Sequence, residues 1–239
     1  MSFDEFKKFF KERLDENNIK LEENQYEKFY NYMVNVLDWN TKINVTAVRE
    51  EKEFIIKHFI DSLMISHYIK DNYKIIDIGT GGGFPGIPLK LYNENIKITL
   101  NDSINKKLNV IRDSIKEFNL KNIDIIHARA EELAIKSEHR EKYDISTTRA
   151  VSNLTTILEY MMPFIKVGGR AICMKGPNYQ EELQAADKAI KVLGGQIEMI
   201  ENFNIGTEYE RNVIVIKKVK QTPSKYPRGG NKPLKEPIM

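Results

Sequence analysis

A glycine-rich segment, DIGTGGGFPG, occupies residues 77–86 between a short apolar run and a stretch of helical character. At the carboxyl end of a strand, glycines let the backbone turn sharply and let a ligand approach without interference from a Cβ atom. A Gly-x-Gly-x-Gly pattern beginning at Gly79 fits loops that bind S-adenosylmethionine, and a Gly-x-Gly-x-x-Gly pattern beginning at Gly81 fits the dinucleotide fingerprint. The segment predicts a nucleoside-cofactor site, with a tight turn that binds nothing as the structural alternative.

Pro85 separates the two cofactors on chemical grounds. A dinucleotide carries a pyrophosphate that accepts hydrogen bonds from free N–H groups at a helix N-terminus, and a proline in that first turn donates none. S-adenosylmethionine has no phosphate, so the proline does not weaken its binding. Asp77, before the glycines, is also expected in a site that receives a cationic amino-acid moiety. These residues favour S-adenosylmethionine.

Two further strand ends carry residues suited to a nucleoside. The second expected strand ends in Asp102, at about the spacing after the loop where a carboxylate accepts hydrogen bonds from ribose hydroxyls. Capping a helix that begins at Ser103 is the alternative role for this carboxylate. The third strand ends at residues 127–131, where an adenine ring would lie.

Other chemistries are not indicated. The four histidines and Cys173 lack the spacing of metal ligands, and neither a Gly-x-Ser-x-Gly elbow nor a Walker loop occurs. Cys173 is expected to be a buried strand thiol. His58 and Asp61 lie one helical turn apart and could face the site, although a local hydrogen bond on the helix surface is the favoured interpretation.

The candidate site residues are positioned by two kinds of elements. Helices are expected in the first part of the chain, and strands that alternate with helices are expected in the rest. Ser2 and Glu5 form a capping box before apolar residues at helical spacing, and further helices are expected over residues 22–39, with an interruption at 40–42, and from about residue 50. After Asp71 the alternation predicts right-handed βαβ units and a parallel, doubly wound sheet. The expected strands are residues 73–78, 96–100, 123–126, 143–146, 170–174, 196–204 and 212–219.

The last two expected strands are joined by only a short polar stretch, residues 205–211. A parallel crossover needs about a dozen residues or more, so a hairpin is expected to place one antiparallel strand in the sheet. Class I methyltransferases have this feature and dinucleotide dehydrogenases usually lack it. The predicted fold class is therefore α/β: a class I methyltransferase Rossmann-like sheet, mostly parallel with one antiparallel strand, and an N-terminal helical extension.

The composition is that of a globular protein with one sizeable domain and an appendage: 239 residues, 41% hydrophobic and 30% charged. We expect an N-terminal helical region over residues 1–70, a cofactor-binding domain over 71–220 and a basic C-terminal tail over 221–239. No apolar run reaches the roughly 18 residues that cross a bilayer, and the N-terminus lacks a signal-peptide core. With a single cysteine, these features predict a cytoplasmic protein without a membrane partner.

Positive charge concentrates at the C-terminus. From Lys217 to Met239 there are seven basic residues and one acid, Glu236, although the net charge of the whole chain is only +3. Such a cluster can neutralise phosphates and release counterions, which favours nucleic acid. A solvated terminus is the other interpretation, and charge alone leaves both open.

Ordered motifs extend over nearly the whole chain. They are DWN at 38–40 with NVTA at 44–47, HFIDSL at 58–63, the glycine-rich segment, AE at 130–131, TRAV at 148–151, KVGG at 166–169 with KG at 175–176, and YPR at 226–228. Together they resemble the bacterial small-subunit ribosomal RNA guanine-N7 methyltransferases, the family once called glucose-inhibited division protein B.

The resemblance implies S-adenosylmethionine as the methyl donor and N7 of a guanine in 16S ribosomal RNA as the acceptor, within the small subunit or a precursor, with no obligate protein partner. An ion pair at the sheet's edge is the structural alternative for Arg149. The cofactor contacts expected from the resemblance, together with Asp102 from the strand pattern, are Gly79, Phe84, Asp102, Ala130, Glu131 and Arg149.

Guanine N7 already has an exposed lone pair, so no catalytic general base and no metal are expected. The sequence also lacks the Asn/Asp-Pro-Pro-aromatic motif with which enzymes that methylate exocyclic amines position an NH₂ group. Arg228 is followed by Gly229 where relatives usually carry a second basic residue, which leaves the RNA contacts of the tail open. The expected RNA-binding residues are Lys225, Arg228, Lys232 and Lys235.

Three other functions remain open from the residues. The overlapping dinucleotide spacing permits a nicotinamide-dependent oxidoreductase. A ribosome-assembly factor that keeps the fold without catalysis is a second alternative, disfavoured by the intact loop. A methyltransferase for a small molecule is the third, and the basic tail is the feature against it.

Overall fold

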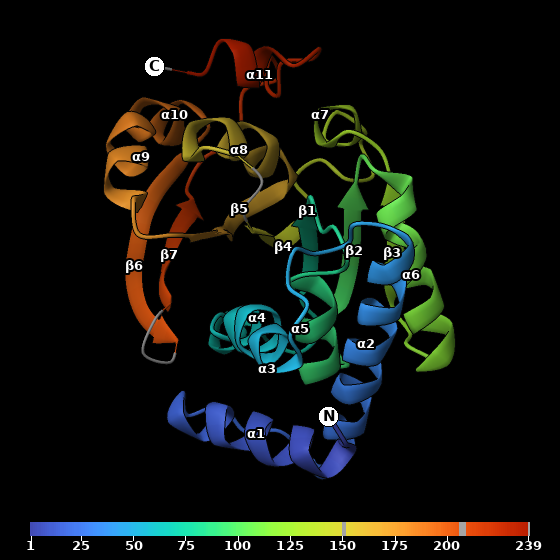
Figure 1. The fold of residues 1–239 in the computed structure, drawn as a ribbon. Helices are drawn as coiled ribbons and strands as arrows, with labels where there is room; N and C mark the ends of the chain where they lie inside the picture. The colour runs from blue at the N-terminus through green and yellow to red at the C-terminus, as the bar shows by residue number, and fades with distance from the viewer. Residues whose placement is uncertain (150–151, 206–208, 239) are drawn as a thin grey trace.

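The computed structural model describes residues 1–149, 152–205 and 209–238. Ala150 and Val151 of the TRAV motif, part of the expected hairpin turn and Met239 of the tail lie outside these ranges. The described residues form one seven-stranded sheet in the order β3-β2-β1-β4-β5-β7-β6 (Figure 1). The strands are β1 Lys74–Ile78, β2 Lys97–Asp102, β3 Ile123–His127, β4 Tyr143–Arg149, β5 Ile165–Lys175, β6 Gly195–Ile205 and β7 Tyr209–Lys218.

The predicted mixed sheet is confirmed. β1 to β5 pair in parallel, and β7 pairs antiparallel with both β5 and β6. The connection between β6 and β7 is too short for a crossover, so β7 returns beside β6 and is inserted between β6 and β5. β5 is longer than its apolar run indicated, because it begins at Ile165 and passes through exposed residues before Arg170. β6 extends the expected range by one buried residue at each end, Gly195 and Ile205.

Alternate residues of the sheet face two separate hydrophobic cores. Ile75 belongs to the core shared with the N-terminal helices, and Ile76 belongs to the core beneath α8 (Leu154–Met161) and α10 (Asp187–Val192). β7 repeats the pattern, with Val213 and Val215 on the first face and Ile214 and Ile216 on the second. This period of two is the geometry of a strand buried on both sides.

The crossover helices cover these two faces. α5 (Gly86–Tyr92) and α6 (Asn105–Glu117) contact β2 on the side of the N-terminal helices. α8, α9 (Tyr179–Ala185) and α10 cover the other face, with the 3₁₀ turn Met162–Phe164 after α8 and the short α7 (Ala130–Leu133) beside it. The sheet is thus buried between two helical layers, as the βαβ alternation predicted.

The N-terminal helices share a core with the sheet. α1 (Phe3–Glu16) begins with the predicted capping box of Ser2 and Glu5, and α2 (Glu23–Lys42) follows it. The ring of Phe59 lies 5.0 Å from that of Phe29 and 5.6 Å from that of Phe10, which joins the first two helices to the third segment. That segment comprises α3 (Glu51–Phe54), the π-helix Ile55–Ile60, α4 (Asp61–Leu63) and the 3₁₀ turn Ser66–Tyr68.

The predicted interruption after Trp39 is wrong, because α2 continues to Lys42. Asn40 does not break the helix; its side chain organises the loop that follows. Its Nδ2 donates to the carbonyl oxygens of Thr46 and Val48, and its Oδ1 accepts from the backbone N–H groups of Val45 and Thr46. A buried asparagine can satisfy loop groups in this way without leaving the helix.

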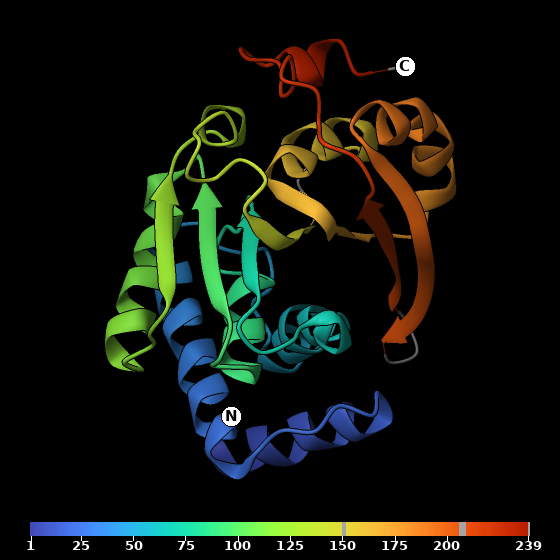
Figure 2. The same cartoon turned by 180° about the vertical axis from the view of Figure 1, so that it is seen from behind.

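The C-terminal segment packs over α8 rather than extending into solvent. Tyr226 and Ile238 are buried in the second core, and Thr156 of α8 donates to the carbonyl oxygen of Pro233 at 3.0 Å. α11 (Lys232–Lys235) lies over α8 at the end of the molecule opposite α1, on the side toward which the carboxyl ends of β1 and β2 point (Figures 1 and 2). Within the described ranges, no helix combines the length and apolar composition needed to span a bilayer.

Candidate cofactor and acceptor site

The glycine-rich loop is held closed by Asp77 at the end of β1. Its Oδ2 accepts hydrogen bonds from Thr80 Oγ1 at 2.6 Å and from the backbone N–H of Gly86 at 2.9 Å. The sequence placed Asp77 in a site for a cationic moiety, but its carboxyl group is buried beneath the loop and binds the loop itself. Burial raises the pKa of Asp77 to about 7, against the opposing effect of these two hydrogen bonds and of Arg149.

The bond to Gly86 also distinguishes between the two cofactor classes. The first N–H of α5 is the group that a pyrophosphate would bind, and Asp77 already occupies it. A negative oxygen at that position also repels a phosphate. Together with Pro85, the N-cap residue of α5, this contact leaves the helix N-terminus unsuited to a dinucleotide.

Two glycines of the loop are required by close packing. Gly83 has φ +97°, and a Cβ there would overlap the Tyr32 hydroxyl, which donates to the carbonyl oxygen of Gly82. A Cβ on Gly86 would overlap Leu100 and lie 2.9 Å from Asp77 Oδ2. The loop therefore lies directly on α2 and β2, and glycine is the residue that permits this approach.

Asp102 at the end of β2 ties the loop to the next helix. Its Oδ2 accepts from the backbone N–H of Gly81 and its Oδ1 from that of Ile104, each at 2.8 Å. The second bond closes a local turn and does not cap the helix, because α6 begins at Asn105 with Ile104 as its N-cap residue and without a side-chain capping bond, so the capping alternative for Asp102 is wrong. Each carboxylate oxygen has a further lone pair, so Asp102 can still accept hydrogen bonds from a ligand.

A pocket of about 530 Å³ lies over the carboxyl ends of β1, β2, β3 and β4. All six predicted cofactor contacts line it: Gly79, Phe84, Asp102, Ala130, Glu131 and Arg149. Arg129, from the strand end expected beside the adenine, and Val45 and Thr46, from the NVTA motif, line it as well. The sequence did not single out two further lining residues, Lys107 and Tyr160.

Glu131 brings a buried carboxylate oxygen to the lining of this pocket. Its side chain is 6% exposed, and its Oε1 has no hydrogen-bond partner within the described part of the chain. The nearest cation, Arg129 Nη1, lies 3.7 Å from it. A buried acceptor without a donor is costly, and a ribose hydroxyl or an amino group of a bound ligand would satisfy it. S-adenosylmethionine, which has such donors and lacks phosphate, fits the residues present.

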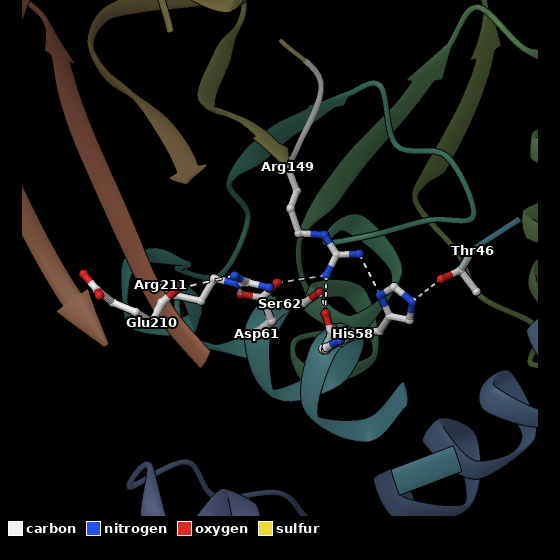
Figure 3. Close-up of polar contacts among 8 residues, drawn as sticks. Thr46, His58, Asp61, Ser62, Arg149, Glu210 and Arg211 are labelled. Atoms are coloured by element: carbon white, nitrogen blue, oxygen red, sulfur yellow. Dashed lines mark hydrogen bonds and ion pairs between the residues drawn. The ribbon is translucent and has the colours of Figure 1, made fainter. Parts of the chain in front are cut away.

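Arg149 lies between the pocket and the N-terminal helices (Figure 3). Its Nη1 donates to the carbonyl oxygen of Lys57 at 2.6 Å and to Asp61 Oδ2 at 3.0 Å, and its Nη2 donates to His58 Nδ1 at 2.8 Å. The ion pair named as the alternative for this arginine is thus present. Arg149 nevertheless lines the pocket as well.

The favoured interpretation of His58 and Asp61 as a local surface pair is wrong. Both side chains are buried, 8% and 2% exposed, and each bonds Arg149 of β4 (Figure 3). The cause is tertiary: the π-helix containing His58 and the helix beginning at Asp61 pack against the end of a strand that is distant in sequence. The local pattern could not reveal this partner.

His58 is a neutral imidazole with a defined tautomer. A guanidinium can only donate, so Nδ1 accepts from Arg149 and the ring proton lies on Nε2, which donates to Thr46 Oγ1 at 2.7 Å. Burial, assisted by the charges of Arg149 and Lys57, lowers the pKa of His58 to about 2. Thr46 belongs to the quoted NVTA motif, which was the only sequence signal for its role.

Phe84 completes this wall of the pocket. Its ring is stacked on His58, with centroids 4.4 Å apart and planes inclined by 16°, and the Arg149 guanidinium lies 5.3 Å from its centroid. Cation–π contact and stacking favour this arrangement. Phe84 therefore positions His58 and Arg149 against the loop in which it lies.

The expected RNA-binding residues have different environments. Lys225, Lys232 and Lys235 are exposed. Arg228 instead forms an ion pair with Glu159, a side chain that is 1% exposed, through bonds of 2.9 and 2.7 Å, and it also donates to the carbonyl oxygen of Glu236. Arg228 therefore anchors the segment that carries the lysines.

Two expectations about other residues can be compared with the structure. Cys173 is buried in β5, as predicted, and burial raises the pKa of its thiol to about 12. Across residues 1–149, 152–205 and 209–238, no group of three or more His, Cys, Asp or Glu side chains is arranged to hold a metal ion.

The sheet order, the antiparallel β7 and a pocket at the carboxyl ends of the first strands define a class I, S-adenosylmethionine-dependent methyltransferase. Comparison with known proteins narrows the class to a family. The model of the GidB family, described as rRNA small subunit methyltransferase G, matches residues 25–214, and the chain belongs to this family.

Individual relatives agree with this assignment. The chain is 48% identical over 222 residues to the ribosomal RNA small subunit methyltransferase G of Acetivibrio thermocellus, which covers 92% of this chain and 91% of the relative. It is 46% identical over 239 residues to that of Alkaliphilus oremlandii, with 98% and 99% covered. Among solved structures, M. jannaschii TYW2 in complex with AdoMet has a TM-score of 0.55 at 15% identity, over 66% of this chain and 75% of that one, and shares the fold.

Proposed function

We propose that this protein transfers a methyl group from S-adenosylmethionine to N7 of a guanine in 16S ribosomal RNA. The observation that carries the proposal is the state of His58 beside the pocket. Its Nδ1 is engaged by Arg149, its Nε2 carries the proton, and its pKa lies near 2. Such a histidine does not act as a base near neutral pH. Guanine N7 is a nucleophile that needs none.

The bound donor supplies an electrophilic methyl group, and the chain's own residues orient and enclose the reactants. Alignment of this kind can lower a barrier by roughly 7–11 kcal/mol. Arg149, Phe84 and His58 form a rigid wall at one end of the pocket, because each contacts the other two. Their mutual contacts limit the positions that an acceptor can adopt.

The donor's nucleoside part is assigned to the opposite end of the same pocket. We assign hydrogen bonds with ribose or base to Asp102 and Glu131, since Glu131 Oε1 is buried and no described residue donates to it. Gly79 and Ala130 allow close approach of the ligand to the backbone. Phe84 and Arg149 border the end where the methyl group would lie.

The RNA is assigned to the surface beside the C-terminal segment. Arg129 links that segment to the pocket, because it lines the pocket and donates to Asn231 Oδ1 at 2.7 Å. The exposed Lys225, Lys232 and Lys235 would meet phosphates there, while Arg228 holds the segment in place. In this proposal residues 71–220 bind the donor, residues 221–239 and the N-terminal helices hold RNA, and the protein acts in the cytoplasm on the small subunit or its precursor.

The experiment that tests this function maps N7-methylguanine in 16S RNA by borohydride and aniline cleavage, in cells with and without the gene. We expect one cleavage site to vanish on deletion and to return with the wild-type gene. Complementation with a Gly83→Asp variant, which cannot close the loop, should not restore it. An unchanged cleavage pattern on deletion would contradict the proposal.

A further inference from the structure

A second cavity of about 620 Å³ adjoins the cofactor pocket on the far side of Arg149. The two spaces share His58 and Arg149 as lining residues, so the guanidinium lies at their boundary. Met174, which is 4% exposed, and Val48 contribute apolar side chains to the cavity, and Ser152 and Gly176 line it as well. The charged lining residues are Lys57, Asp61, Arg149, Lys175, Glu182 and Arg211.

Arg149 has hydrogen-bonding capacity left for a ligand in this cavity. A guanidinium has five N–H donors. Both hydrogens of Nη1 are directed to Lys57 and Asp61, and one hydrogen of Nη2 is directed to His58. Within the described residues the Nε–H and the second Nη2 hydrogen have no acceptor, so they remain for an acceptor atom placed between the two spaces.

Glu182 lines the second cavity and not the cofactor pocket, and one of its oxygens is already bonded within the protein. Its Oε2 accepts from the backbone N–H of Leu154 and from Lys175 Nζ, each at 2.7 Å. Lys175 is itself fixed by a bond of 2.6 Å to the carbonyl oxygen of Ser152. The carboxylate is therefore oriented, and its Oε1 makes no hydrogen bond with the described residues.

The order of these groups matches the order of atoms around a guanine. N7, O6, then N1–H and the N2 amino group follow one another along the edge of the base. Arg149 lines both spaces and Glu182 lines only the second, so a base that passes from the cofactor pocket into the cavity meets Arg149 before Glu182. An acceptor oxygen suits Arg149, and a pair of donors suits a carboxylate.

We propose that this cavity receives the acceptor guanine and that Glu182 determines its identity by accepting from N1–H and the N2 amino group, while Arg149 donates to O6. The inference rests on the proposed function and assigns its acceptor subsite. Adenine is disfavoured there, because its unprotonated N1 would face the carboxylate and its exocyclic amine would face Arg149. Lys57, which pairs with Glu53, and Arg211, which pairs with Asp61, line the same cavity and are the cations that we assign to the nucleotide's phosphates.

The test is the Glu182→Gln variant, with inosine as the altered substrate. Leu154 N–H and Lys175 Nζ are donors, so the amide oxygen must turn toward them and the NH₂ group toward the base. Glu181→Gln is the matched control, since Glu181 precedes it on α9 and is exposed. Both variants and the wild type are assayed on small subunits reconstituted with ligated 16S RNA that carries guanosine or inosine at the methylated position.

Inosine keeps N7, O6 and N1–H and lacks only the N2 amino group. We expect the wild type and Glu181→Gln to prefer guanosine over inosine by roughly tenfold in kcat/KM. Glu182→Gln should lose most of that preference, and its kcat/KM on guanosine should fall by roughly 10- to 100-fold. The affinity for S-adenosylmethionine, measured by equilibrium dialysis, should stay unchanged. Because the preference is a ratio, it does not depend on the fraction of folded enzyme.

The outcomes separate the two proposals. A wild-type enzyme that leaves guanosine N7 unmethylated contradicts the proposed function. Methylation by the wild type, with Glu182→Gln retaining the wild-type ratio of guanosine to inosine, overturns the role of Glu182. The role of Glu182 is also overturned if Glu182→Gln loses S-adenosylmethionine affinity and activity together while its guanosine-to-inosine ratio stays at the wild-type value. Such a result would show that Glu182 supports the structure and does not contact the base.

Discussion

The Asp77 carboxylate accepts the backbone N–H of Gly86 at 2.9 Å, across the glycine-rich loop. This single contact closes the loop and removes the hydrogen-bond donor that a pyrophosphate would use. The same sequence segment that matches a dinucleotide fingerprint is therefore folded so that it receives a ligand without phosphate. The nicotinamide-dependent alternative fails here for a physical reason, in agreement with the family assignment.

Asp77 and His58 should affect stability with opposite pH dependences. The pKa of Asp77 is raised from 3.8 to about 7 in the fold, so its contribution is present at low pH and is lost as pH rises toward 7. The pKa of His58 is lowered from 6.5 to about 2, so its contribution is present above 6.5 and is lost as pH falls. The unfolding free energy of Asp77→Asn, relative to that of the wild type, should therefore increase as pH rises. The unfolding free energy of His58→Gln, relative to that of the wild type, should increase as pH falls.

Urea unfolding at about pH 5, 6 and 7 measures both differences. The difference in unfolding free energy between each variant and the wild type should change by at most about 1.4 kcal/mol per pH unit, at pH values between the unfolded-state and folded-state pKa of the group. Glu132→Gln is the control, because Glu132 is exposed. The unfolding free energy of this variant should change with pH as that of the wild type does. Slopes of the same sign for the Asp77 and His58 variants would contradict the assigned protonation states.

Gly83→Ala should disrupt the loop. The added Cβ overlaps the Tyr32 hydroxyl in a backbone conformation of φ +97°, which costs about 1–3 kcal/mol of unfolding free energy. S-adenosylmethionine affinity should fall at the same time, because the loop must move away from α2. Gly229→Ala, whose Cβ would meet nothing within 4 Å, is the matched control. Thermal unfolding and isothermal titration calorimetry report the two effects, and a wild-type affinity for Gly83→Ala would show that the loop tolerates displacement.

Glu131→Gln should weaken S-adenosylmethionine binding roughly tenfold. A hydrogen bond to a charged acceptor contributes about 1.5–3 kcal/mol, and the neutral amide keeps only part of it. The unfolding free energy of the free protein should rise slightly or stay level, since the buried Oε1 receives no hydrogen bond from the residues that the structure describes. Equilibrium dialysis with labelled donor measures the affinity, with Glu132→Gln as the control. Equal affinities for the two variants would remove Glu131 from the binding site.

Arg228→Ala and Lys232→Ala should separate structural from RNA-binding roles in the C-terminal segment. Loss of Arg228 leaves the buried Glu159 without its partner, so unfolding free energy should fall by about 3 kcal/mol. Lys232 is exposed, so its loss should leave the unfolding free energy unchanged. It should reduce the slope of log binding constant against log salt concentration by about one, the value for one lost phosphate contact. Chemical denaturation and filter binding at several salt concentrations distinguish them. The double variant Arg228→Ala, Glu159→Gln should recover part of the lost stability.

The sequence by itself determined the fold and most of the elements. Apolar runs that alternate with helical patterns are a local signal, and a short link between the last two runs left only a hairpin for β6 and β7. The residues at strand ends followed from the same reasoning, because parallel strands bring their carboxyl ends to one edge. Gly79, Asp102 and Glu131 therefore line one pocket although they are distant in sequence.

The tertiary structure decided what those residues contact. Asp77 looked like a ligand group and binds the loop, and Arg228 looked like an RNA contact and is held by Glu159. His58 and Asp61 looked like a helix-surface pair and instead receive Arg149, which follows them by about 90 residues and reaches them only through the packing of β4 on a π-helix. Spacing along the chain reports the face on which a side chain lies. Its partner, its protonation state and the boundary between two cavities depend on which elements pack together.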